Sequence, residues 1–177
     1  APFLGGQAST LDIGGVRLER GYHHLFLSDT AIIDLMDEIG LGDRLRWIES
    51  RVGVFYDDKI WNFVTPLDLL KFTSLPMIDR VRLGLVTLLL KRQKDWRKFE
   101  HITAKDWIEK WAGTKNFEVF WGPMLRGKFG AYFEEIGMPW FWGKVQTRFA
   151  SRKGLMGREK LGYPIGSFAE IFELGQT

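Results

Sequence analysis

The sequence predicts a helix-dominated α+β fold, with a small antiparallel sheet built from two β-hairpins and covered by about six helices. Two stretches in the first third of the chain are typical of strands, because they alternate apolar and polar residues or are rich in β-branched and aromatic residues. From Pro66 onward the apolar residues recur every three or four positions, which is typical of helices. No repeat or low-complexity linker divides the sequence, so we expect residues 1–177 to form a single domain.

The first predicted hairpin pairs residues 10–13 with residues 16–20 around Gly14-Gly15. Glycine supplies the positive φ that a tight two-residue hairpin turn requires. The second predicted hairpin pairs residues 46–56 with residues 59–64, two segments rich in Trp, Ile, Val, Phe and Tyr, around the turn residues Asp57-Asp58. We expect both hairpins to share one sheet.

A helix is predicted between the hairpins, with one apolar face formed by Ile32, Leu35, Met36 and Ile39. Ser28 or Asp29 is its expected N-cap, and Gly40 ends it. Further helices are predicted over residues 66–72, 76–94, 103–112, 117–125, 138–149 and 167–174. Pro123 lacks an N–H, so we expect a break or kink in the helix that contains it.

Composition excludes several classes of function. Apolar residues make up 45% of the chain and aromatic residues 15%, which is ample for a core and excludes disorder. The 25 basic and 22 acidic residues are too evenly balanced to predict nucleic-acid binding. The sequence has no Cys, which excludes disulfides and thiolate metal sites and fits the reducing cytoplasm.

The histidines do not predict a metal site. His23 and His24 are adjacent at the end of a predicted strand, where neighbouring side chains point to opposite sides, and His101 is far away in the sequence. No Ser-His-Asp spacing, phosphate loop or GxGxxG pattern occurs. We therefore expect no metal and assign no catalytic residue.

The longest apolar run, residues 83–90, lies between basic residues at positions 80, 82, 91, 92 and 94. It is far shorter than the about 20 apolar residues that a membrane-spanning helix needs. Two interpretations remain open. The segment packs against another domain, or residues 78–94 lie on an anionic membrane surface as an amphipathic helix.

Lys144, Arg148 and Arg152 recur at a spacing of four residues, with Lys153 adjacent, and predict a basic stripe on the last long helix. A base-stacking nucleic-acid surface would need aromatic residues on the same side. The nearby aromatic residues fall mostly on the opposite side, so a solvated helix face is favoured and no nucleic-acid partner is expected.

The glycine-containing motifs carry a resemblance to a known family. Residues 4–9 read LGGQAS, residues 19–23 read ERGYH, and residues 161–168 read LGYPIGSF. In this order the motifs resemble FAD-dependent oxidoreductases of the amine oxidase, phytoene desaturase and protoporphyrinogen oxidase group, in which the first motif reads roughly GGR-x-x-S and the second D-x-G-x-H. The resemblance covers nearly the whole chain. Gln7 replaces the usual Arg, and Glu19 replaces the usual Asp.

The resemblance implies that the chain is the substrate-binding portion of a larger flavoenzyme. Residues 1–9 and 164–177 would be the crossings to the FAD domain. The residues implied to contact FAD are Gly5, Gly6, Ser9, Gly21, His23 and Gly166, and those implied to meet a substrate or flavin charge are Arg126 and Lys128. Because the glycine-rich phosphate loop of the family is absent, we expect this piece alone to retain no FAD and to be inactive.

The expected function is therefore oxidation of a small apolar substrate by hydride transfer to the flavin of the parent enzyme. The alternative is a non-enzymatic helical module that binds a protein partner or a membrane surface.

Overall fold

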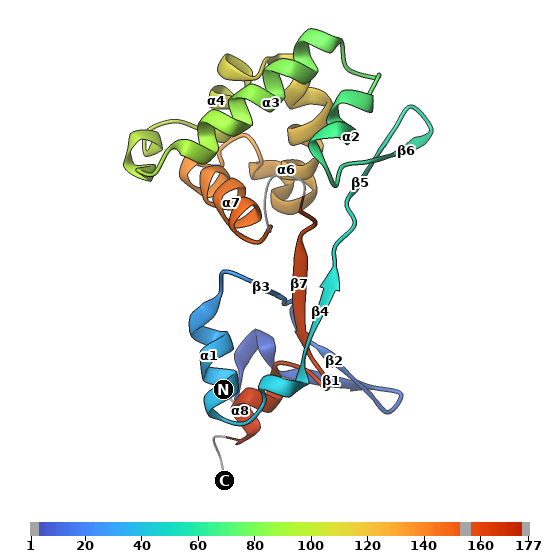
Figure 1. Ribbon diagram of the computed structural model, residues 1–177, viewed down its shortest axis with the longest axis vertical. Coiled ribbons are helices and arrows are strands. Elements are labelled where there is room, and N and C mark those ends of the chain that lie inside the picture. Colours follow the sequence, from blue (N-terminus) through green and yellow to red (C-terminus); the bar gives the residue numbers. More distant parts are fainter. Residues whose placement is uncertain (1–3, 153–156, 175–177) are drawn as a thin grey trace. The chain divides into compact units, whose positions relative to one another are not determined.

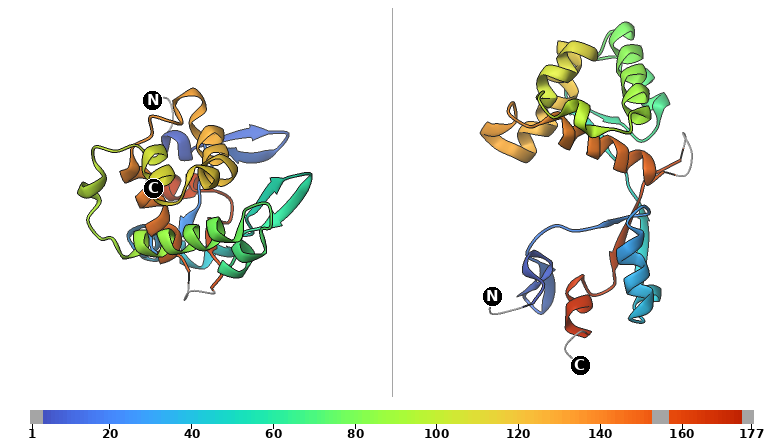
Figure 2. Two further views of the ribbon diagram at one scale, coloured as in Figure 1. Left: turned by 90° about the horizontal axis from the view of Figure 1, so that it is seen from above. Right: turned by 90° about the vertical axis from the view of Figure 1, so that its left-hand side faces the viewer.

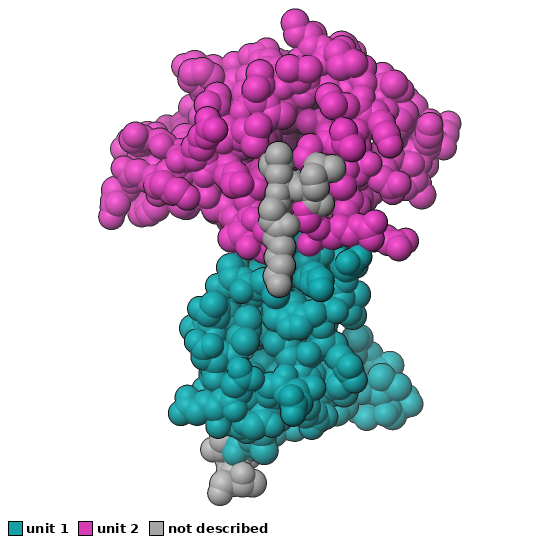
Figure 3. Space-filling model, viewed as in Figure 1, with its two compact units in different colours: residues 1–50, 159–177 teal, residues 51–158 magenta. Residues whose placement is uncertain are grey.

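The computed structural model describes residues 4–152 and 157–174 and confirms a helix-dominated α+β fold (Figure 1). The chain forms two compact units, which Figure 3 shows in different colours. Unit 1 comprises residues 1–50 and 159–177, and unit 2 comprises residues 51–158. That residues 1–177 act as one domain with crossings at 1–9 and 164–177 stays a prediction. Residues 1–3 and 175–177 of those crossings lie outside the described part of the chain.

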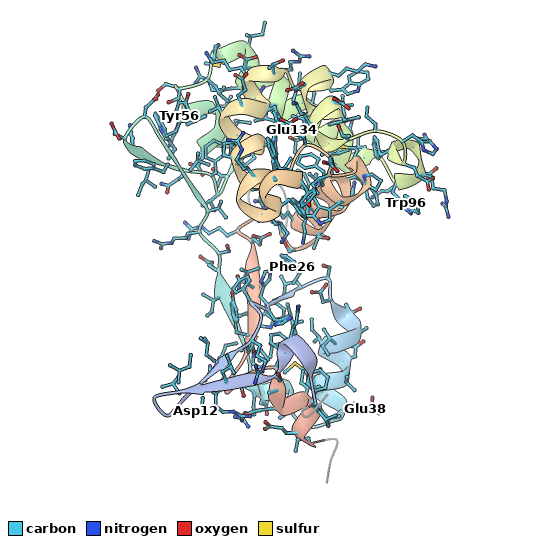
Figure 4. The ribbon with its side chains drawn as sticks, turned by 180° about the vertical axis from the view of Figure 1, so that it is seen from behind. Asp12, Phe26, Glu38, Tyr56, Trp96 and Glu134 are labelled. Atoms are coloured by element: carbon cyan, nitrogen blue, oxygen red, sulfur yellow. The ribbon has the colours of Figure 1, made fainter. Side chains whose placement is uncertain are left out.

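Unit 1 begins with the predicted first hairpin. Strands β1 (Thr10–Ile13) and β2 (Val16–Glu19) pair antiparallel, and Thr10 lies opposite Glu19. Both turn glycines have positive φ, 63° at Gly14 and 82° at Gly15. Figure 4 labels Asp12 beside this turn, where its Oδ1 accepts a hydrogen bond from the Gly15 amide at 3.1 Å.

The second sheet of unit 1 corrects the prediction that the two hairpins share one sheet. It contains three antiparallel strands in the order β3 (Leu25–Phe26), β7 (Lys160–Pro164) and β4 (Leu45–Glu49). Residues 46–49 were expected in the second hairpin, but they pair with a strand more than 100 residues away. The Trp47 ring packs against the opposite Gly162, where an added Cβ would lie only 3.0 Å from the ring.

Two helices complete unit 1. Helix α1 (Thr30–Glu38) starts after Asp29, which is one of the two predicted caps, and α8 (Ala169–Leu174) ends the described chain. The buried core of this unit consists of Leu25, Met36, Leu41 and Phe168.

Unit 2 begins with the second hairpin, formed by β5 (Gly53–Tyr56) and β6 (Lys59–Asn62), which is a separate two-stranded sheet. Asp57 and Asp58 form its turn with φ of 52° and 53°, as the turn prediction requires. Figure 4 labels Tyr56 at the end of β5.

The described residues that follow this hairpin in unit 2 are mainly helical, and Figure 2 gives two further views of the helices. The helices are α2 (Pro66–Lys71), α3 (Met77–Arg92), α4 (Ala104–Trp111), α5 (Thr114–Asn116), α6 (Gly122–Phe129) and α7 (Met138–Ala150). The predicted cap of α4 is confirmed, because Thr103 Oγ1 accepts the Asp106 amide at 3.0 Å. The main core includes Leu90, Ile108, Leu125 and Phe141.

The break predicted at Pro123 takes the form of a change in helix type. A π-helical turn, Phe117–Trp121, separates α5 from α6, and Pro123 lies in the first turn of α6. Proline has no N–H to donate to the preceding turn, so the regular α-helical hydrogen-bond pattern cannot run through it. π-turns are common at functional sites, and this one places Phe120 and Trp121 beside the cavity described below.

Candidate functional site

Hydrogen bonds in unit 1 join the first two glycine-containing motifs. The Gly21 amide donates to the Gln7 carbonyl at 2.9 Å, and the Arg20 amide donates to the Ser9 carbonyl at 2.9 Å. Ser9 is buried, and its hydroxyl donates to the Gly6 carbonyl at 2.6 Å. Four of the predicted cofactor-binding residues, Gly5, Gly6, Ser9 and Gly21, therefore belong to one compact hydrogen-bonded turn system.

Glu19 attaches the C-terminal motif to this system. Its Oε1 accepts the Phe168 amide at 2.8 Å, and its Oε2 lies 3.6 Å from His23 Nδ1. The rings of His23 and Phe168 are 6.1 Å apart. A single carboxylate thus holds together residues 149 positions apart, although the sequence identified Glu19 only as a replacement for the usual Asp.

Three glycines shape the backbone here. Gly5 has φ of 87°, and a Cβ on it would lie 3.0 Å from Phe172 Cδ2. Gly166 has φ of 99°, and a Cβ on it would lie 2.9 Å from Glu170 Cδ. Gly6 differs, since no atom of the described residues beyond its chain neighbours lies within 4 Å of the Cβ position. A ligand can therefore approach the Gly6 backbone closely, as the predicted flavin contact requires.

His23 and His24 lie in different surroundings. His23 lies beside Glu19, whereas the His24 ring packs edge-on against Phe26 with ring centroids 4.8 Å apart. Next to His24, the hydroxyls of Tyr22 and Tyr163 are 3.0 Å apart. Burial, the hydrogen bond with Tyr22 and nearby negative charge raise the pKa of Tyr163 to about 12. In the described residues, no group of three His, Asp or Glu side chains could hold a metal ion.

Unit 2 contains a separate apolar cavity of about 230 Å³. Its walls come from the segment after β6, from α2 and α3, from the π-helical turn and from the end of α7. The lining residues are Phe63, Val64, Thr65, Pro66, Leu69, Leu83, Gly84, Thr87, Leu88, Phe120, Trp121, Phe149 and Arg152. Such a cavity favours an apolar ligand. Periodicity identified several of these residues as helix faces, but not the space between them.

The two hydroxyl groups of this lining already donate hydrogen bonds to protein acceptors. Thr87 donates to the Leu83 carbonyl at 2.7 Å, and Thr65 donates to Asp68 Oδ2 at 3.0 Å. Burial acts to raise the pKa of Asp68, but hydrogen bonds from Thr65 and from the Val64 amide outweigh it and hold that pKa below its usual value. Asp68 caps α2 and does not itself line the cavity.

Arg152 differs from its sequence prediction. Lys144 and Arg148 are exposed on α7, as expected for a solvated face. Helix α7 ends at Ala150, however, and Arg152 lies beyond it, half-buried in the cavity wall. Its Nε is buried and has no hydrogen-bond partner in the described residues. The regular four-residue spacing concealed this position, because spacing does not show where a helix ends.

Arg126 and Lys128, the predicted substrate-binding residues, are exposed on α6 and do not line the apolar cavity. Arg126 lines a second recess of about 300 Å³ together with Glu118 and Glu134, and its guanidinium lies 4.5 Å from the centroid of the Phe133 ring. The Lys128 ammonium lies 5.9 Å from the centroid of Trp140. Their role in substrate binding stays a prediction.

No helix of the described residues is long and apolar enough to cross a membrane. In comparisons with known proteins, no curated protein matches this chain. The family model of flavin-containing amine oxidoreductases matches residues 1–174, which include the glycine-containing motifs of unit 1 and the cavity of unit 2. The chain therefore belongs to the flavin-containing amine oxidoreductase family.

Proposed function

We propose that this chain is the substrate-binding portion of a flavin-dependent oxidoreductase that acts on an apolar substrate. The observation that carries the proposal is the apolar cavity of unit 2, where Arg152 is the single charged residue among the described lining residues. Binding cavities of this kind hold a ligand mainly by burying apolar surface, and a few polar groups orient it. Membership of a flavin-containing family supports the redox assignment.

In this proposal the turn system of unit 1 contributes contacts to the FAD of the parent protein. Its residues are Gly5, Gly6, Ser9, Gly21 and His23, with Gly166 in the C-terminal motif. The open side of Gly6 supports this role, because a cofactor can lie against a backbone that no described side chain covers. The sequence contains no GxGxxG phosphate loop, so we expect the isolated chain to retain no FAD.

Flavin, when bound, accepts a hydride from the substrate. The task of the cavity residues is to exclude water and to orient the substrate. Trp121 and Phe120 form a T-shaped pair, with ring centroids 4.7 Å apart, that stiffens one wall. Trp121 also packs edge-on against the buried Phe141 at 4.6 Å. These contacts give the cavity a fixed shape on which selection between substrates can depend.

Filling the cavity of the FAD-containing parent protein tests this proposal. Gly84 lies in α3 and lines the cavity, so Gly84→Leu places a side chain inside it. The variant should keep its FAD content and lose reduction of the flavin by substrate, measured from the flavin absorbance without oxygen. Gly127→Leu, on the exposed side of α6, is the matched control. Unchanged reduction in Gly84→Leu would refute the assignment of the cavity.

A second candidate function is docking on an anionic membrane surface, and an exposed apolar stripe on α3 favours it. The stripe comprises Met77, Ile78, Val81, Leu85, Leu88 and Leu89, which are 40% to 76% exposed. At about 100° per residue these positions fall within about 120° of the helix circumference. The opposite side of α3 carries the buried Leu83 and Leu90, so the stripe adds nothing to the core of unit 2.

The charges beyond the stripe match an anionic lipid surface better than a neutral protein partner. Five basic residues follow at the C-terminal end of α3, namely Lys91, Arg92, Lys94, Arg97 and Lys98. Trp96, labelled in Figure 4, lies among them and is 40% exposed. Each basic residue near an anionic bilayer contributes about 1 kcal/mol. Arg82, which the sequence grouped with these cations, instead donates to the Trp111 carbonyl at 2.6 Å.

Vesicle sedimentation tests the membrane proposal. The chain should sediment with phosphatidylcholine vesicles that contain phosphatidylserine, and much less with phosphatidylcholine alone. The double variant Leu85→Ser, Leu89→Ser should lose this binding. Val16→Ser, Leu18→Ser removes equally exposed apolar residues from β2 and should keep it. Equal loss in both variants, or no sedimentation at low salt, would exclude docking through the stripe.

A further inference from the structure

Among the residues that the structure describes, Arg152 is the one charged residue in the lining of the apolar cavity. The described residues supply no hydrogen-bond partner for its buried Nε, and no carboxylate lines the cavity. A buried donor without a partner is destabilising, and a charged one more so. Structural arginines in such positions are normally paired with a carboxylate. A guanidinium left without one in a ligand-sized cavity therefore indicates that the partner arrives with the ligand.

We propose that the cavity takes an apolar molecule that carries a carboxylate, and that Arg152 binds this group. The proposal rests on the proposed function of the cavity and specifies the substrate class. A planar guanidinium matches a carboxylate with two parallel hydrogen bonds. The Thr65 and Thr87 hydroxyls already donate to protein acceptors, so neither competes with Arg152 for the carboxylate.

The positive charge also excludes a class of ligand. A protonated alkylamine would place a second positive charge beside Arg152 without a carboxylate in the lining to compensate. Lys91 adds to this effect, because its ammonium lies 4.8 Å from the ring centroid of Phe149, another lining residue. Like charges in such surroundings repel each other more strongly than they do in water. The apolar part of the molecule would pack against apolar lining residues such as Leu69 and Trp121.

Calorimetric titration of the 177-residue chain with octanoate, octan-1-ol and octylamine separates the effect of head-group charge from that of apolar burial. The three probes share an apolar chain and differ only in their head groups. We expect octanoate to bind about tenfold or more tightly than octan-1-ol, since hydrogen bonds to charged groups are worth that much, and octylamine to bind most weakly. Arg152→Gln should abolish the preference for octanoate and leave octan-1-ol binding unchanged.

Two further variants separate the hydrogen-bond geometry of Arg152 from the effect of positive charge alone. Arg152→Lys keeps the positive charge but loses the paired N–H donors of the guanidinium, so it should retain part of the preference for octanoate. Arg148→Gln removes an exposed charge from α7 and should retain all of that preference. If octan-1-ol binds and octanoate binds no more tightly, or if Arg152→Gln keeps the preference, the carboxylate assignment is overturned while the apolar cavity stands. If none of the three probes binds, the proposed function of the cavity fails as well.

Discussion

Substitutions at Gly84 test whether the cavity of unit 2 has open space beside α3, because a small added side chain should stabilise the fold. The residue lies inside α3, where glycine costs about 0.5–1 kcal/mol relative to alanine. Its φ is not in the left-handed region, and the atom nearest to an added Cβ is Leu69 Cδ2 at 3.7 Å, an ordinary contact distance. The added methyl group would lie in the cavity wall and bury apolar surface worth up to about 0.8 kcal/mol.

Gly84→Ala should therefore raise the free energy of unfolding by about 1 kcal/mol. For a chain of this size, that corresponds to an increase in Tm of about 2–4 °C. Thermal unfolding followed by circular dichroism measures the change. Gly127→Ala, in α6 with nothing within 4 Å of its Cβ position, should show the propensity gain alone. If Gly84→Ala is destabilised while Gly127→Ala is stabilised, the space beside Gly84 is not open to a methyl group and the predicted gain is wrong.

Three further predictions concern single interactions. Glu19→Ala should lower the free energy of unfolding by about 1–3 kcal/mol, because the Phe168 amide loses its charged acceptor. Urea titration measures this loss, and Glu19→Gln, which keeps an acceptor oxygen, should recover much of the stability. Gly166→Ala should cost more than about 1 kcal/mol in the same titration, since its φ of 99° disfavours a Cβ and Glu170 occupies the space; a neutral result would contradict this geometry. The lowered pKa of Asp68 stabilises the fold above the usual value of 3.8, and this stabilisation is lost as the pH falls below it. Asp68→Asn should thus be less stable at pH 7 and lose less stability between pH 7 and pH 3, and parallel pH profiles of the two proteins would exclude this role.

Local signals predicted the helices and hairpin turns well. Thr103 and Asp106 identified the start of α4, and Asp57-Asp58 identified the turn between β5 and β6, because capping and turn formation depend on neighbouring residues. The pairing of β4 with β7 could not be predicted in this way. Trp47 and Gly162 face each other across the sheet, although they are 115 positions apart in the sequence, and no local pattern specifies such a partner.

In the candidate site, too, the sequence identified local motifs but not the features formed by distant segments. The glycine-containing motifs pointed to Gly5, Gly6 and Gly166 through a family resemblance, and the structure adds Glu19 as the carboxylate that holds the motifs together. The cavity could not be predicted from the sequence, since its walls come from several segments between residues 63 and 152. Arg152 illustrates the reason. Its spacing placed it on a solvated stripe, but the end of α7 at Ala150 turns it into the cavity wall.

We propose that an apolar ligand occupies the cavity of unit 2 in a protein that binds flavin. Titration of the FAD-containing parent protein with octanoate, followed by its flavin absorbance bands, measures whether the cavity binds such a ligand. We predict a saturable change of the bands in the unmodified protein and in Gly127→Leu, and none in Gly84→Leu at equal FAD content. A change of the same size and midpoint in Gly84→Leu would contradict the claim.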